Sequence, residues 1–144
     1  MFGTPVEPDF QSRHVRERVE EVREYLEANL TRDLDMNRVA RDVALSPFYL
    51  TRIFKARYGV PPYRYLIGLR IDYAVELLRD SSLSVTQICH RVGFNSLSHF
   101  ITTFRHHTGL SPSRYRAVLD WEQDAGRFGH ETEALVHHPR RRDQ

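Results

Sequence analysis

The sequence predicts an all-α fold of about seven helices, arranged as two helix-turn-helix subdomains that a long linker helix joins. Three observations support it. Apolar residues recur at helical spacing along most of the chain, no segment of any length alternates with the period of a strand, and one block of sequence occurs twice. The chain has 144 residues, of which 40% are apolar and 28% are charged, and this composition is typical of one globular domain.

Three helices are expected in the first part of the chain. The first covers residues 12–29, where four apolar residues follow helical spacing: Val15, Val19, Val22 and Leu26. Asp35 is a suitable N-cap for a short second helix. Ser46 and Pro47 are the residue types of an N-cap and a first helical position, so a third helix begins there. It ends before Gly59, which can supply the left-handed conformation that closes a helix.

Four more helices follow. Residues 62–80 hold apolar side chains at helical spacing and predict the one long helix in the middle of the chain. Ser84 begins a capping-box pattern, which predicts a short helix, and the next helix is closed by Gly109. A last helix is expected over residues 112–119, with Trp121 packed against it.

Two stretches of the chain are copies of one motif. At an offset of 49, the residues Val39, Ala40 and Val43 align on Ile88, Cys89 and Val92. At an offset of 50, Leu50, Phe54, Lys55, Gly59, Pro62, Arg64 and Tyr65 align on Phe100, Phe104, Arg105, Gly109, Pro112, Arg114 and Tyr115. Each copy has the proportions of a DNA-binding helix-turn-helix. The expected organisation is an N-terminal extension (1–12), a domain (13–119) with helix-turn-helix units at about 35–59 and 84–109, and a mobile tail (120–144).

The net charge of +2 conceals a basic middle. Residues 34–119 carry 12 Arg or Lys and 5 Asp or Glu, which is +7, whereas residues 1–33 and 120–144 carry −3 and −2. This distribution favours a polyanionic partner, which the total alone would not. A single cysteine excludes an internal disulfide and zinc sites built on paired Cys. No apolar run is long enough for a bilayer and no signal peptide is present, so a cytoplasmic protein without a membrane partner is expected.

The outer faces of the two second helices carry side chains suited to DNA. They are Phe48, Thr51, Arg52 and Lys55 in the first copy, and Ser98, His99, Thr102 and Arg105 in the second. Arg52 can donate two hydrogen bonds to guanine, and Thr51 can contact a thymine methyl or accept from a base amine. Lys55 and Arg105 suit phosphate. The linker helix, about 27 Å long, would separate the two second helices by nearly the ~34 Å between successive major grooves.

A long motif in the second copy resembles the signature of the AraC/XylS transcription regulators. It consists of Gly93-Phe94-Asn95-Ser96, Ser98-His99-Phe100, Phe104-Arg105, Gly109, Ser111-Pro112 and Tyr115-Arg116. The resemblance covers about residues 13–119. It implies that a monomer inserts its two units into adjacent major grooves of double-stranded DNA. The expected location is therefore the cytoplasm, in association with the nucleoid. Because many members activate transcription by contacting RNA polymerase, the resemblance also implies an activator with RNA polymerase as a further partner.

By position, the resemblance places base contacts on Phe48, Thr51 and Arg52 in the first unit and on Ser98, His99 and Thr102 in the second. We expect phosphate contacts from Ser46, Tyr49, Lys55, Asn95, Ser96 and Arg105. Two residues depart from the family pattern. Thr102 stands where relatives often have a long or basic side chain, which predicts either weak base readout or readout of DNA shape there. Cys89 stands where Ala is usual and is expected to be a core residue.

The alternatives to a DNA-binding regulator belong to two other classes of function. A helical interaction module that has lost DNA binding is motivated by Thr102 and the acidic ends of the chain, whereas an enzyme has no residue support. No cofactor motif is present, and the pairs His106-His107 and His137-His138 lack the further ligands of a metal site. Most family members carry a separate sensing domain, for which this chain has no room. We therefore expect a stand-alone regulator like the small MarA-like members, with a fragment or an accessory protein as the alternative.

Overall fold

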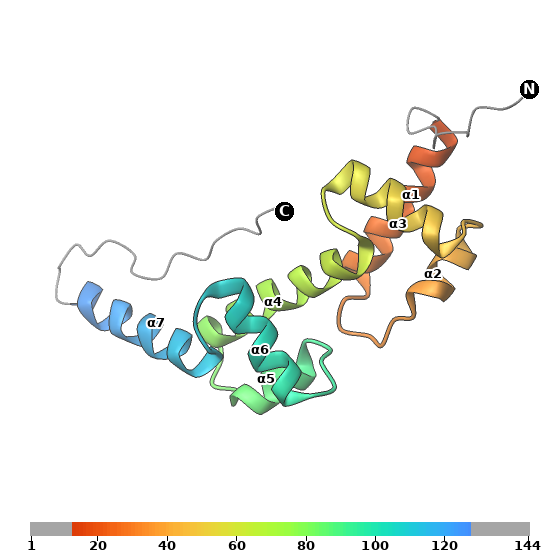
Figure 1. Cartoon of the computed structure of the whole chain (residues 1–144). Helices are drawn as coiled ribbons and strands as arrows, with labels where there is room; N and C mark the ends of the chain where they lie inside the picture. The colour runs from red at the N-terminus through yellow and green to blue at the C-terminus, as the bar shows by residue number, and fades with distance from the viewer. Residues whose placement is uncertain (1–12, 128–144) are drawn as a thin grey trace, which may run out of the picture. The chain divides into compact units, whose positions relative to one another are not determined.

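The computed structural model describes residues 13–127, and this part of the chain folds into seven α-helices without a strand (Figure 1). The predicted all-α fold is therefore confirmed for the described residues. The helices are α1 (Arg13–Ala28), α2 (Met36–Asp42), α3 (Pro47–Tyr58), α4 (Pro62–Asp80), α5 (Val85–Arg91), α6 (Leu97–Thr108) and α7 (Pro112–Arg127). None of these helices is both long and apolar enough to cross a membrane. The expected N-terminal extension, residues 128–144 of the expected tail and the pair His137-His138 lie outside the described residues.

The chain divides into two compact units, and the division falls within α4, between Ile67 and Gly68. Each unit contains one helix-turn-helix and its own apolar core. The first core includes Val19, Val22, Leu26, Val39, Ala40, Leu50, Ile53, Phe54 and Leu66. The second includes Ile71, Ala74, Leu78, Ile88, Cys89, Val92, Phe94, Phe100, Phe104 and Tyr115. Cys89 is fully buried, as its alignment with Ala40 predicts, and burial raises the pKa of its thiol.

The capping residues predicted for the first unit are confirmed. Asp35 caps α2 by accepting a hydrogen bond from the backbone of Asn37, and Ser46 caps α3. Gly59 closes α3 in the left-handed conformation at φ 87°. The turn between α2 and α3 places Ala44 at φ 60°, a conformation that costs a residue with a Cβ about 1–2 kcal/mol.

The same devices shape the second unit. Ser84 and Gln87 form both hydrogen bonds of the predicted capping box at the start of α5. Ser96 caps α6, and Gly109 closes it at φ 90°. The turn between α5 and α6 uses Gly93 at φ 105° where the first unit has Ala44. Both copies of the motif therefore form the helix-turn-helix that the repeat predicts.

Helix α7 is longer than the sequence analysis expects. It runs to Arg127 instead of ending at residue 119, and Trp121 lies within it with 51% of its surface exposed. The prediction that Trp121 packs against the last helix is therefore wrong. Hydrophobic periodicity fades after Leu119, but the following residues include no proline and no glycine before Gly126, so nothing interrupts the helix.

Candidate nucleic-acid interface

The outer face of α3 presents the four side chains predicted for it. Phe48, Thr51, Arg52 and Lys55 are exposed, while Leu50, Ile53 and Phe54 on the opposite side are buried. The Arg52 guanidinium carbon lies 5.9 Å from the centroid of the Phe48 ring. The Thr51 hydroxyl donates to the carbonyl of Pro47 at 2.9 Å. Its proton is therefore committed to the helix, while its lone pairs and methyl group remain available to a base.

The N-terminal end of α3 holds two of the predicted phosphate contacts. Ser46 Oγ accepts from the backbone N–H of Tyr49 at 3.1 Å. Because its lone pair makes the cap, the exposed Ser46 hydroxyl keeps a proton to donate to a phosphate oxygen. The partly exposed Tyr49 lies in the first turn of the helix.

The outer face of α6 also carries its predicted side chains. Ser98, His99, Thr102 and Arg105 are exposed. Asn95 and Ser96 are exposed just before the helix, and Ser96 Oγ accepts from the backbone of His99 at 3.2 Å, as Ser46 does in the first unit. The structure thus places the predicted base contacts of each unit on the exposed face of that unit's second helix, while Ser46, Asn95 and Ser96 lie just before the helices.

Phe94 supports His99 in a way that the sequence analysis misses. The His99 and Phe94 rings lie 5.3 Å apart in an edge-to-face arrangement. The buried Phe94 ring also lies 6.0 Å from the guanidinium carbon of Arg70, a charged residue that is only 7% exposed. His99 is therefore held against a ring of the turn. The only sign of this in the sequence is the presence of both residues in the AraC-like motif.

The basic groups of the two faces differ in their pairing from the arginines that contact α1 in the first unit. Among residues 13–127, no carboxylate lies within ion-pair distance of Arg52, Lys55 or Arg105. Arg23 and Arg57, by contrast, pair with glutamates of α1. Unpaired positive charge on an exposed face is available to a polyanion.

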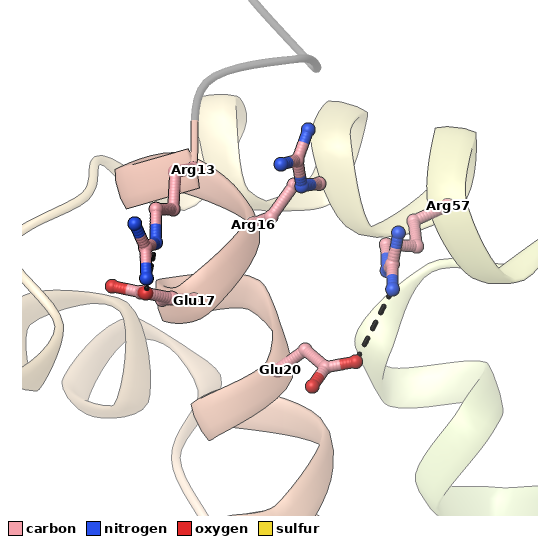
Figure 2. Close-up of a pocket in the computed structure, with 5 residues that line it drawn as sticks. All are labelled: Arg13, Arg16, Glu17, Glu20 and Arg57. Atoms are coloured by element: carbon pink, nitrogen blue, oxygen red, sulfur yellow. Dashed lines mark hydrogen bonds and ion pairs between the residues drawn. The ribbon is translucent and has the colours of Figure 1, made fainter.

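A second polar region lies between α1 and α3 in the first unit. Figure 2 shows an open cleft in which Arg13 pairs with Glu17 and Arg57 pairs with Glu20, each at 3.2 Å. Arg16 completes its lining. Because these arginines face carboxylates of their own unit, the cleft is a poor match for an anionic ligand.

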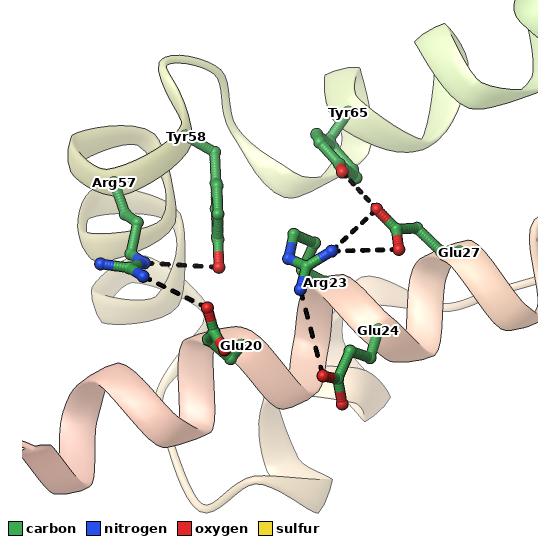
Figure 3. A network of polar contacts seen from close by, with 7 residues as sticks. All are labelled: Glu20, Arg23, Glu24, Glu27, Arg57, Tyr58 and Tyr65. Carbon is green, nitrogen blue, oxygen red and sulfur yellow. Dashed lines mark hydrogen bonds and ion pairs between the residues drawn. The ribbon is translucent and has the colours of Figure 1, made fainter.

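Figure 3 shows the network that continues this region toward the start of α4. Arg23 donates twice to Glu27, at 3.0 and 3.1 Å, and the Tyr65 hydroxyl donates to Glu27 at 2.6 Å. Arg57 lies 5.6 Å from the centroid of the Tyr58 ring. Hydrogen bonds to Tyr58 and Glu27 raise the pKa of Arg23. The network joins α1 to the end of α3 and to α4, and we interpret it as structural.

The described residues contain no cluster of three His, Cys, Asp or Glu side chains that could hold a metal ion.

Comparison with known proteins shows which family this chain belongs to. A family model described as a helix-turn-helix domain matches residues 39–117. An AraC-type DNA-binding domain protein from Chromobacterium violaceum is 32% identical, with a TM-score of 0.65, over 75% of this chain and 96% of that one. The chain belongs to the AraC family of helix-turn-helix transcription regulators. AraC-family membership places this chain in a family of transcription factors and not in an enzyme family.

Other transcription factors are also similar to this chain. The transcriptional activator RhaS of Escherichia coli O139:H28 is 40% identical over 96 residues, which are 67% of this chain and 34% of RhaS. This chain thus spans about a third of the length of that curated relative. The DNA-binding domain of the global transcriptional factor AdpA, solved in complex with a target DNA, is 29% identical with a TM-score of 0.71. That match covers 74% of this chain and 96% of the AdpA domain.

Proposed function

We propose that the protein binds double-stranded DNA of specific sequence as a monomer, inserting α3 and α6 into adjacent major grooves. The observation that carries the proposal is the pair of equivalent exposed faces, whose basic side chains have no carboxylate partner among the described residues. The likeness to the AdpA domain in its DNA complex supports it.

The proposed base contacts are Phe48, Thr51 and Arg52 from α3 and Ser98, His99 and Thr102 from α6. The proposed phosphate contacts are Ser46, Tyr49, Lys55, Asn95, Ser96 and Arg105. The two units belong to one domain over residues 13–119, with the long helix α4 as the linker. The further part of the proposal is activation of transcription through RNA polymerase in the cytoplasm, which the similarity to the activator RhaS supports. A stand-alone regulator stays a prediction.

Electrophoretic mobility shift at several salt concentrations tests the DNA-binding proposal. Because each neutralised phosphate releases counterions, affinity for a duplex should fall steeply as salt rises. The plot of log K against log salt has a negative slope, and Lys55→Gln and Arg105→Gln should each reduce its magnitude by about 1. The matched control is Arg13→Gln, because Arg13 is exposed but pairs with Glu17 on α1. Absence of duplex binding at every salt concentration would instead favour the helical interaction module.

Selection from a random duplex library tests the binding mode. Two units in adjacent major grooves should select a bipartite motif whose halves are about 10 base pairs apart. A single short motif would contradict the insertion of both helices.

Run-off transcription with purified RNA polymerase from a promoter that carries the selected site tests activation. An increase in transcript that is lost with Arg52→Ala supports an activator, and a decrease identifies a repressor.

A further inference from the structure

We infer that Phe48 and Arg52 act together as a recognition pair, which contacts a thymine methyl group and the major-groove edge of a neighbouring guanine. The inference rests on the proposed function and makes it specific, because it assigns a base-pair step to the first unit. It arises from the contact between these two side chains and from the exposure of the Phe48 ring.

The Phe48 ring has no role in the folded core. It is 72% exposed, more than any other large hydrophobic side chain among the described residues. Burial of a phenylalanine ring is favourable because it removes apolar surface from water, and the fold of this chain leaves most of that gain unused. Its position in the first turn of α3 is the end of a recognition helix that approaches base edges. An apolar partner in the major groove would bury the ring, and the thymine methyl is the apolar group that the groove offers.

The Phe48 ring also restricts Arg52. The two residues are one helical turn apart, and the guanidinium lies over the ring at 5.9 Å. A guanidinium held in this way loses less side-chain entropy when it binds than one that moves freely. With no carboxylate partner among residues 13–127, its donors are available for the O6 and N7 atoms of guanine. Because ring and guanidinium are in contact, the thymine and the guanine should lie on adjacent base pairs or on base pairs separated by one other pair.

The second unit provides an internal control for the pair. At the equivalent positions, 50 residues later, it has Ser98 and Thr102, which are both exposed. Neither side chain offers an aromatic surface or a bidentate donor. The proposed recognition of thymine beside guanine is therefore confined to the half-site that binds α3.

The test uses the full chain and the duplex obtained by library selection, with affinities measured by fluorescence anisotropy at one fixed salt concentration. Each thymine is replaced in turn by deoxyuridine, which removes only the methyl group. Each guanine is replaced in turn by 7-deazaguanine, which removes only the N7 acceptor. The variants are Phe48→Ala, Phe48→Leu and Arg52→Ala. The controls are Thr51→Ser, which removes the other methyl group of the same face, and Ser98→Ala in the second unit.

For the wild-type chain, one deoxyuridine substitution in the first half-site should weaken binding about three- to fivefold, the effect of one buried methyl group. Phe48→Ala should abolish that sensitivity, whereas Thr51→Ser and Ser98→Ala should retain it. One 7-deazaguanine within two base pairs should weaken binding about fivefold or more, and Arg52→Ala should abolish this effect. Phe48→Leu should keep the methyl effect and reduce the guanine effect, because it retains an apolar surface without the ring.

Three results would overturn the inference. Phe48→Ala could keep the full sensitivity to deoxyuridine, or Thr51→Ser could abolish it, which would assign the methyl contact to Thr51. The sensitive thymine and guanine could also lie more than two base pairs apart. Any of these leaves the proposed DNA binding intact. Failure of the wild-type chain to select any duplex overturns the proposed function itself, and this outcome precedes every comparison of variants.

Discussion

The two units share one helical plan but hold it together with different contacts. In the first unit, Tyr58 and Tyr65 are half-buried and meet the charged side chains of α1 at the surface (Figure 3). At the equivalent positions of the second unit, Thr108 bonds to the carbonyl of Phe104 and Tyr115 is only 1% exposed. Both copies therefore bury an aromatic core, with Tyr58 and Tyr65 packed on Phe54 in the first, but only the first adds a surface ionic network at these positions.

The surfaces of the two recognition helices differ as well. The first presents an aromatic ring and a guanidinium at the positions where the second presents Ser98 and Thr102. Both helices retain a basic residue one turn later, Lys55 in the first and Arg105 in the second. Under the proposed function, this difference assigns the bidentate base contact to the first unit. The base contacts proposed for the second unit then depend on single hydrogen bonds and on readout of DNA shape.

The largest expected effect concerns Arg116, which only the second unit has. Its guanidinium donates to the backbone carbonyls of Leu77, Leu78, Ser81 and Leu83, where α4 ends. The first unit has the buried Leu66 at the equivalent position. Arg116→Met should lower the free energy of unfolding by about 2–4 kcal/mol, because several partly buried carbonyls lose their donor. Urea unfolding followed by circular dichroism measures this loss.

Arg114→Met is the matched control for Arg116, since Arg114 lies on the same helix and is exposed. It should change stability by less than about 0.5 kcal/mol. Hydrogen exchange should locate the loss of protection of Arg116→Met in α5–α7 and leave α1–α3 unchanged. Equal effects of the two variants would show that the carbonyl contacts contribute nothing specific to the second unit.

The next effect tests the difference between the recognition helices. Arg52→Ala should cost about 1–3 kcal/mol of binding free energy and relax the base preference at one position. Thr102→Ala, at the equivalent position, should cost less than about 0.5 kcal/mol, because a single hydroxyl makes no bidentate contact. Library selection with each variant measures both quantities. A uniform weakening of all sequences by Arg52→Ala would assign Arg52 to phosphate instead.

The two turns should respond differently to substitution. Gly93→Ala should destabilise the second unit by about 1–2 kcal/mol, because φ 105° is unfavourable for a residue with a Cβ. Ala44→Gly should change stability by about 0.5 kcal/mol or less, since relief of strain at φ 60° opposes the extra entropy of glycine in the unfolded chain. Thermal unfolding measures both. A large loss with Ala44→Gly would mean that Ala44 is unstrained.

The sequence predicted those parts of the fold that depend on neighbouring residues. Caps such as Ser46 and Ser84, and closing residues such as Gly59, are recognisable because the contacts they make are local. The contact of Arg116 with α4 spans more than 30 residues, so no local pattern reveals it. The end of α7 was missed because the residues after Leu119 carry no apolar stripe, the pattern from which most of the other helices were predicted.

Prediction of the candidate DNA-binding site from the sequence is limited in the same way. Helical spacing was sufficient to place Thr51 and Arg52 on the exposed face of α3, and the contact of Arg52 with Phe48 follows from their separation by one turn. The support of His99 by Phe94, and of Phe94 by Arg70, depends on how the turn folds back on α4 and α6. Such contacts depend on the tertiary structure, which periodicity does not encode.

The smallest effect tests the ionic network of the first unit. Tyr65→Phe removes the hydroxyl that donates to Glu27 and should lower stability by about 1 kcal/mol. Tyr63→Phe is the control on the same helix, because Tyr63 is 49% exposed. Burial, and then the hydrogen bond to Glu27, raise the pKa of Tyr65 above its usual value of 10.0.

Above about pH 10 the unfolded chain therefore loses the Tyr65 proton while the folded chain retains it, so the stability of the wild type should fall as pH rises. This fall should be shallower in Tyr65→Phe, and the two stability curves should converge above pH 10 after running parallel at lower pH. The burial of Tyr115 raises its pKa in both proteins, so part of the alkaline loss should persist in the variant. Curves that stay parallel up to about pH 11 would show that folding does not raise the pKa of Tyr65. The surface network would then not distinguish the first unit from the second.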